Sequence, residues 1–191
     1  METETRFKPE NKLEKNIIDS DIFKSGIKQS KAKGPAHPEK NPGEHIHQIL
    51  NFIDIQDWGN YRTNLRFLAL LHDLGKQNTL YDENRNLISN NHSFYSEEIA
   101  RNFISDENLL KSIKIHDKYF HFFKDDNRGK FNEGKFLKTF SDVNLDTLLR
   151  FNYADSNNRE KDSVKWAEDK FYELGLTKHK IYEDNLKWTI F

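Results

Sequence analysis

The chain has 191 residues with 30 basic and 31 acidic side chains, which give a net charge of −1. This balance argues against a protein that coats nucleic acid non-specifically, although a local basic patch remains possible. It contains no cysteine, so disulfides, thiolate metal ligands and cysteine nucleophiles are excluded. Only 35% of the residues are hydrophobic, and because the longest apolar run is the short stretch 67–71, we predict a cytoplasmic protein without a membrane-spanning segment.

The first 36 residues are rich in charge, and a cluster of lysines runs from Lys28 to Lys33. We predict a short helix near residues 12–24, followed by a mobile connector. A charged, solvated arm is the simplest interpretation of this segment. The lysines could alternatively hold phosphate groups.

A helix start is indicated by Asn41-Pro42-Gly43-Glu44, in which the asparagine can cap, the proline suits the first helical position and the glutamate completes a capping box. The helix should end near residue 57. By the helical period, His47 falls at the edge of the apolar face, whereas His45 shares that face with three large side chains, Ile49, Phe52 and Ile53. An imidazole on an apolar face needs a polar partner.

The next predicted helix covers residues 62–73 and carries the longest apolar run of the chain. His72 lies on its buried face, and Asp73 follows directly. Gly75 stands just beyond the helix end, where a left-handed cap is expected. Because polar groups removed from water are costly without a partner, the His72-Asp73 pair should have one in the folded protein.

The remainder of the chain alternates between loop-like and helical patterns. Residues 77–91 have the composition of a loop. Helices are predicted at 93–104, 106–122, 134–140 and 144–157 and around Val164 to Leu174, with a turn-rich insertion at 125–134. Since no alternating strand pattern or hairpin turn is found, the predicted fold class is all-α, a single helical bundle.

Four aromatic residues are concentrated in one predicted helix: Tyr119, Phe120, Phe122 and Phe123. Their rings could stack on a nucleic-acid base. Helical spacing, however, lets Tyr119, Phe122 and Phe123 be buried together, which favours a role in the hydrophobic core.

Polar residues thus stand on the apolar stripes of three predicted helices. They are His45, the His72-Asp73 pair, and Asp155, which continues the stripe of the 144–157 helix. Imidazole and carboxylate groups are ligands that divalent metals accept, so a bound ion would explain why these residues are buried. Their inward placement on separate helices favours a shared site over coincidence.

His92 and His116 could supply two ligands to a second ion, with an aspartate bridging the two ions. The alternative is a structural or exposed role for each single histidine, because eight histidines will meet aspartates by chance. A second His-Asp pair does occur at His116-Asp117. It lies between lysines and aromatic residues, so only His116 is included among the candidate ligands.

These positions lie within five longer segments: AHPEKNPGEHIHQIL (36–50), RFLALLHDLGK (66–76), NNHSFYSEEIA (90–100), IHDKYFHFF (115–123) and LLRFNYADSNNR (148–159). In this order they resemble the HD-domain metal-dependent phosphohydrolases, and most closely the HD domain attached to bacterial CCA-adding tRNA nucleotidyltransferases. The resemblance covers residues 36–159. No nucleotidyltransferase motif occurs in this chain, so CCA addition is not expected.

The resemblance implies a set of ligands for one or two divalent ions: His45, His72, Asp73, His92, His116 and Asp155. His45, His72, Asp73 and Asp155 match the core ligands of the family, and the other two match those of its two-ion members. Asp73 would also orient the water that attacks phosphorus. The donor types do not distinguish among Mn, Ni, Co, Mg and Fe.

The resemblance also implies residues that contact substrate. Lys76 and Arg159 would bind phosphate, with Arg66 and Arg150 as weaker candidates. Lys76 could instead be a cation that stabilises a helix end through the helix dipole. His37 matches a histidine of the family for which no role is assigned.

The chain departs from its relative at two places. Asn91 stands where the relative has a glycine before the third motif histidine, which affects the loop geometry at His92. Asn157 and Asn158 replace an arginine and a glycine, which affects phosphate contacts near Arg159.

The resemblance implies a metal-dependent phosphohydrolase, of the phosphatase or 2′,3′-cyclic phosphodiesterase type, that acts on nucleotides or RNA termini through a metal-activated water. The alternatives are a non-catalytic helical module that binds metal or nucleotide, and a metal-free helical interaction protein. The expected organisation is a charged N-terminal arm (1–36), an HD domain (37–160) and a C-terminal helical extension packed on it (161–191). No stable protein partner is predicted.

Overall fold

The computed structural model describes residues 6–28, 41–78, 80–81, 87–89, 91–156, 161–181 and 186. Its helices are α1 (Lys12–Asp19), α2 (Asp21–Gly26), α3 (Pro42–Asp54), α4 (Arg62–Leu71), α5 (His92–Ala100), α6 (Glu107–Ile115), α7 (Lys118–Asp126), α8 (Glu133–Phe140), α9 (Leu145–Ser156) and α10 (Lys161–Glu173). The 3₁₀ helices η1 (Gly59–Tyr61) and η2 (Leu74–Asn78) flank α4, and the short strands β1 (Leu80–Tyr81) and β2 (Leu87–Ser89) follow η2. The predicted all-α class is confirmed.

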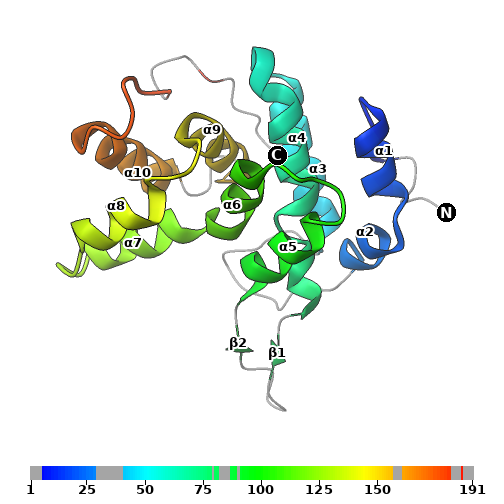
Figure 1. Ribbon diagram of the computed structural model, residues 1–191, viewed down its shortest axis with the longest axis horizontal. Coiled ribbons are helices and arrows are strands. Elements are labelled where there is room, and N and C mark those ends of the chain that lie inside the picture. Colours follow the sequence, from blue (N-terminus) through cyan, green and yellow to red (C-terminus); the bar gives the residue numbers. More distant parts are fainter. Residues whose placement is uncertain are drawn as a thin grey trace.

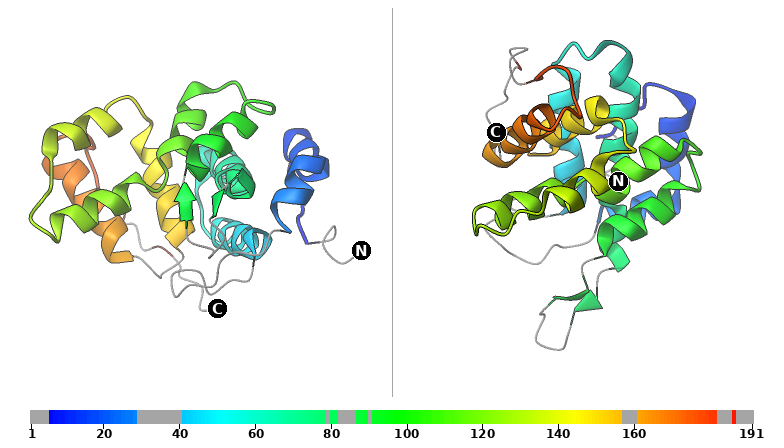
Figure 2. Two further views of the ribbon diagram at one scale, coloured as in Figure 1. Left: turned by 90° about the horizontal axis from the view of Figure 1, so that it is seen from below. Right: turned by 60° about the vertical axis from the view of Figure 1, so that its left-hand side comes forward.

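Helices α3 and α4 lie at the centre of the molecule, with α1 and α2 on one side and α7, α8 and α10 on the other (Figure 1). Figure 2 shows the same arrangement from two further directions. Helix α9 packs against α3, α4 and α10, and fully buried leucines such as Leu65, Leu68 and Leu148 belong to the core around it. Among the described residues, no helix is both long and apolar enough to cross a membrane.

The start of α3 agrees with its prediction. The Asn41 side chain accepts a hydrogen bond from the Glu44 amide at 2.9 Å, and Pro42 is the first helical residue. The helix ends at Asp54, somewhat earlier than predicted. His45 is buried among the apolar residues of this helix, as expected from the spacing.

Helix α4 ends at Leu71, with His72 as its C-terminal cap residue. The predicted left-handed conformation of Gly75 is wrong, because this glycine has no positive φ. Gly75 instead allows η2 to approach α5 closely: a Cβ at this position would overlap the carbonyl oxygen of His92 and the backbone nitrogen of Ser96. The glycine is needed for contact between two backbones rather than for a turn.

Residues 6–28, the described part of the N-terminal segment, are not the solvated arm that their charge suggests. Phe7 and Phe23 are buried in the core with their rings edge to face, 5.4 Å apart. Glu14 is fully buried, and it accepts hydrogen bonds from the buried guanidinium of Arg66. The single predicted helix is divided at Ser20, whose hydroxyl caps α2 by accepting a hydrogen bond from the Phe23 amide. Residues 6–28 therefore pack against the rest of the fold and contribute buried side chains to its core.

Two further predictions need correction. The helix predicted at 106–122 is divided into α6 and α7, because the chain turns at His116 and Asp117. The loop predicted at 77–91 contains η2 and the antiparallel strands β1 and β2, with Leu80 paired to Ser89. The expectation that the chain has no strand is therefore wrong at this hairpin.

The aromatic residues of α7 belong largely to the core. Tyr119 and Phe122 are buried, as predicted, and the Phe122 ring lies 5.1 Å from that of Phe136 on α8. The Phe123 ring is only half-buried, beside Trp166 of α10. These ring contacts join α7, α8 and α10 into one packed unit, so the core role of Tyr119 and Phe122 is confirmed.

Candidate metal centre

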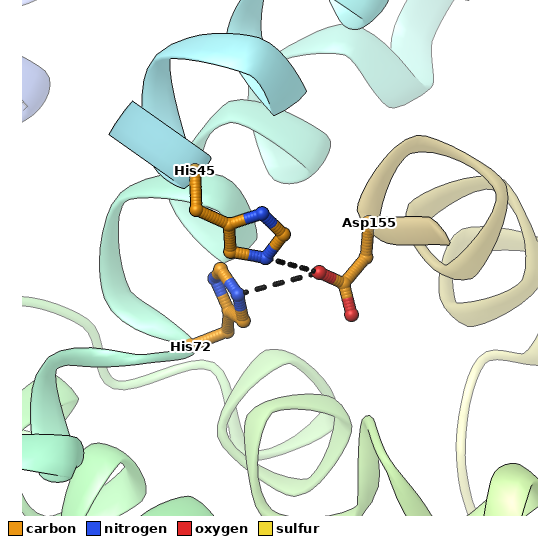
Figure 3. Close-up of side chains that lie close together, drawn as sticks. All are labelled: His45, His72 and Asp155. Atoms are coloured by element: carbon orange, nitrogen blue, oxygen red, sulfur yellow. Dashed lines mark hydrogen bonds and ion pairs between the residues drawn. The ribbon is translucent and has the colours of Figure 1, made fainter. Parts of the chain in front are cut away.

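Ligand-type side chains from α3, from the end of α4 and from α9 meet at one point. His45 Nε2 lies 2.8 Å from Asp155 Oδ1, and His72 Nε2 lies 3.5 Å from the same oxygen (Figure 3). Asp73 Oδ2 lies 3.5 Å from His72 Nε2 and 4.0 Å from His45 Nε2. The structure thus brings together the four residues that the sequence marks as ligands of one ion.

His72 is held so that one ring nitrogen faces this centre. Its side chain is 1% exposed, and its Nδ1 lies 3.1 Å from the Ala69 carbonyl oxygen. Because a carbonyl can only accept a hydrogen bond, Nδ1 carries the proton and Nε2 carries the lone pair. Among the described residues, His72 Nε2 has no hydrogen-bond partner. A buried lone pair is costly without a partner, and a metal ion would provide one.

His92 and His116 form a second group of ligand atoms beside the first. Their Nε2 atoms are 3.4 Å apart, and His116 Nδ1 donates to the Ile113 carbonyl at 2.7 Å. Asp73 Oδ1 lies 3.7 Å from His92 Nε2, and His72, Asp73 and His116 have ligand atoms within 4.8 Å of one another. Asp73 therefore lies between the two groups, where a bridging carboxylate would have to be.

The donor set fits a divalent cation. An ion bound at roughly 2.0–2.2 Å to nitrogen or oxygen places neighbouring ligand atoms about 3–4 Å apart. The distances of 2.8–4.0 Å among His45, His72, Asp73 and Asp155 fall near this range. Nitrogen and oxygen donors without sulfur are compatible with Mn, Ni, Co, Mg or Fe and do not choose among them.

Burial lowers the pKa of two histidines in the centre. It lowers the pKa of His72 to about 3, although the neighbouring Asp73 carboxylate acts in the opposite direction. Burial also lowers the pKa of His92 to about 4. Burial alone would raise the pKa of Asp155, but the hydrogen bond from His45 and the adjacent imidazoles lower it by more. Near pH 7 the imidazoles of His72 and His92 are therefore neutral and Asp155 is ionised, the states in which these groups bind metals.

Lys76 lies on η2 and forms an ion pair with Asp73 Oδ2. Its side chain is 22% exposed and that of Asp155 is 18% exposed, whereas the side chains of His72 and Asp73 are each 1% exposed. Among these four residues, solvent therefore reaches Lys76 and Asp155 most easily. The contact with Asp73 places the lysine beside the candidate ligands.

The two weaker candidates for phosphate binding are engaged elsewhere. The guanidinium of Arg66 is buried and donates to Glu14 and Asp54. Arg150 donates to the Asp146 carbonyl and stacks over the ring of Tyr61 at 4.1 Å. Both guanidinium groups therefore have partners within the protein, and their positions do not require a bound phosphate.

Phe151 is a residue of the site that the sequence did not single out. Its fully buried ring lies 5.2 Å from the ring of His72 and 6.4 Å from that of His116. Phe151 stands four residues before Asp155 on α9, so the two share a helix face, and this spacing is the signal that could have identified it. Its ring provides an apolar wall against which both imidazoles pack.

Arg159, a predicted phosphate contact, and His37, for which no role was predicted, lie outside the described residues. Comparisons of this chain with protein-family models, with curated proteins and with solved structures find no match. The chemistry of the centre is therefore inferred from its own side chains.

Proposed function

We propose that this chain is a metal-dependent phosphohydrolase with an HD-type centre, a phosphatase or 2′,3′-cyclic phosphodiesterase that acts on nucleotides or RNA termini. The observation that carries the proposal is the convergence of His45, His72, Asp73 and Asp155 from separate helices. The buried Nε2 of His72 adds support, because a lone pair in this position is the one that a metal would use.

The four convergent side chains would hold the ion. A bound divalent ion would supply acidity to a water molecule and polarise a phosphoryl oxygen. Asp73 has one carboxylate oxygen beside His72 and Lys76 and the other toward His92. This position suits it to orient the attacking water toward phosphorus and to accept a proton from it.

A phosphate would approach the centre past the more exposed Lys76 and Asp155. The carboxylate of Asp155 repels an anion, so a cation on the approach path is needed to offset that repulsion. The ammonium of Lys76, held by its ion pair with Asp73, would meet this need. It would also stabilise the negative charge that develops on the phosphoryl oxygens during in-line attack.

The second candidate function is a non-catalytic module in which the metal has a structural or sensing role. The observation that favours it is the depth of the ligands, because His72 and Asp73 are each only 1% exposed. A closed set of ligands is typical of structural metal sites, whereas catalytic sites keep one position open. The exposure of Lys76 and Asp155 favours the catalytic alternative.

The test uses the two His-Asp pairs of the chain as a matched comparison. Purified protein is assayed with Mn²⁺, Ni²⁺ or Co²⁺ on p-nitrophenyl phosphate and on 2′,3′-cyclic nucleotides. Asp73→Asn should abolish hydrolysis, because the amide loses the charge that binds the ion and orients water. Asp117→Asn changes the equivalent residue of the second pair, which is not among the candidate ligands, and should keep the wild-type rate.

Full activity in Asp73→Asn would refute the assignment. A wild-type protein that binds metal stoichiometrically but hydrolyses none of these substrates would favour the non-catalytic module. Elemental analysis of the purified chain separates both from a metal-free interaction protein.

A further inference from the structure

The N-terminal helical pair, defined as residues 6–28 with α1 and α2, contacts the start of α3. The Gly43 amide donates to the Ile27 carbonyl at 3.2 Å. A Cβ on Gly43 would lie 3.2 Å from both the oxygen and the Cβ of Ile27, so the two backbones touch without spare room. Arg6 adds two hydrogen bonds of 2.7 Å to Glu44. The helical pair thus holds the turn of α3 that carries His45.

The same helical pair also contacts η2. Gly26 packs on Leu74, and a Cβ at Gly26 would lie 3.0 Å from Leu74 Cδ2. The Ser25 hydroxyl donates to Gln77 Oε1 at 3.3 Å. Leu74 follows Asp73 directly in the chain, so this contact supports the segment that places the Asp73 carboxylate.

A buried ion pair joins the helical pair to α4, whose C-terminal cap is His72. Glu14 and Arg66 are 0% and 2% exposed, and the guanidinium also donates to the Lys8 carbonyl at 2.8 Å. In Figure 1, α1 and α2 accordingly lie beside the central helices. Residues 6–28 therefore contact all three chain segments that carry His45, His72 and Asp73.

We propose that the N-terminal helical pair is a positioning element of the candidate metal centre, which fixes the start of α3 and η2 relative to each other so that His45 and Asp73 face the same point. The proposal rests on the proposed function in so far as that function needs a bound metal. Ligand atoms must be held within about 0.5 Å of their bonding positions, so a residue that shifts a ligand segment weakens metal binding even when the fold survives. None of residues 6–28 would touch the ion.

Two glycines in equivalent helix positions allow a matched test. Gly43 and Gly134 are each the second residue of a helix that follows an asparagine cap. Gly43→Ala inserts a methyl group 3.2 Å from Ile27 and 3.3 Å from its own cap oxygen, Asn41 Oδ1, whereas Gly134→Ala meets only Asn132 Oδ1 at 3.7 Å. Gly26→Ala, which inserts a methyl group against Leu74, provides a second and independent disturbance.

The measurement is the dissociation constant for Mn²⁺ by calorimetry on the full chain, together with guanidinium unfolding of the metal-free protein. Gly43→Ala should weaken Mn²⁺ binding about tenfold or more, in the range seen when groups that support metal ligands are changed. Gly26→Ala should weaken it by a smaller factor, since the end of the Leu74 side chain can move. Gly134→Ala should leave the constant unchanged.

The proposal is overturned if Gly43→Ala and Gly26→Ala both fold and both bind Mn²⁺ with the wild-type affinity. This holds even if the two variants unfold at lower guanidinium concentrations, because a loss of stability alone is what a merely structural role would give. If Gly43→Ala does not fold, Gly26→Ala decides the question by the same criterion. Wild-type protein that binds no divalent ion would overturn the proposed function and this inference with it. Wild-type protein that binds Mn²⁺ without hydrolysing phosphate esters would refute only the catalytic proposal.

Discussion

The rings of His72 and His116 pack edge to face with centroids 5.2 Å apart, although one residue follows α4 and the other follows α6. Each ring donates its Nδ1 proton to the carbonyl three residues earlier, at Ala69 and at Ile113. Carbonyls in the last turn of a helix lack an intrahelical donor, so a histidine at the cap position satisfies one of them. The same bond fixes the tautomer and leaves Nε2 of each ring as the candidate metal-binding atom. The helix ends therefore orient two candidate ligands before any ion arrives.

Metal binding should stabilise the folded chain. An ion that binds only the native state at a concentration of 100 times its dissociation constant adds about 2.7 kcal/mol. For a protein of this size that energy raises the melting temperature by roughly 5–10 °C. Melting curves of chelator-treated protein, recorded with and without added Mn²⁺, measure the difference.

The control for this experiment is His72→Gln, which removes the lone pair that faces the centre. Its melting temperature should not respond to Mn²⁺, whereas that of His121→Gln, a change at an exposed histidine on α7, should respond as the wild type does. An equal response in His72→Gln would place the metal elsewhere.

The metal-free protein should lose stability as the pH falls below about 6.5, the ordinary value for histidine. Burial lowers the pKa of His72 to about 3 and that of His92 to about 4, so the unfolded chain binds protons that the folded chain does not. Between its unfolded and its folded pKa, each such group then lowers the free energy of unfolding by about 1.4 kcal/mol for every unit by which the pH falls. Urea titrations at pH 7.5, 6 and 5 should show the free energy of unfolding decreasing throughout.

A variant that cannot titrate at these positions checks the cause. In His72→Gln/His92→Gln the free energy of unfolding should depend less steeply on pH between 7.5 and 5. If its slope equals that of the wild type, other groups are responsible for the acid sensitivity.

His45, His72 and Asp155 could be predicted as ligands because each of them interrupts an apolar stripe. The positions of His45 and Asp155 follow from helical spacing alone, and the structure places both inward with a hydrogen bond of 2.8 Å between them. Their meeting in space does not follow from spacing, since 110 residues separate them in the chain. The order of the segments resembling the HD family supplied that expectation.

The role of residues 6–28 was not predictable from their local pattern. Glu14 lies in a strongly charged stretch, and its burial depends on Arg66, which is 52 residues away. The sequence also shows no sign of the break between α6 and α7, because no glycine or proline stands there. At this break the imidazole of His116 contacts that of His92, which is 24 residues away in the chain. In both places the local structure involves a residue far away in the chain, which a local sequence pattern does not reveal.

Lys76 should affect catalysis more than metal binding. Lys76→Ala removes a cation from the approach to the centre, so the catalytic rate should fall about 100-fold, as is common when a group that stabilises transition-state charge is lost. The Mn²⁺ dissociation constant should change much less, because Lys76 is not a ligand. Lys118→Ala removes the lysine that pairs with Asp117 of the second His-Asp pair and should have neither effect. Loss of metal binding in Lys76→Ala would indicate instead that the lysine only holds Asp73 in place.

Gly75 should be the least replaceable glycine of the site. A methyl group at this position would overlap the His92 carbonyl and the Ser96 amide nitrogen, and the existing hydrogen bond from the Gly75 amide to the Ser96 hydroxyl, 2.8 Å long, holds the two segments in contact. Gly75→Ala should therefore destabilise the chain by about 3 kcal/mol or more, measured by urea unfolding. Gly134→Ala, in a helix with open space around it, should be neutral or stabilising by up to about 1 kcal/mol. If the two variants unfold at the same urea concentration, η2 and α5 do not pack as closely as this structure indicates, and the position of His92 beside Asp73 would need revision.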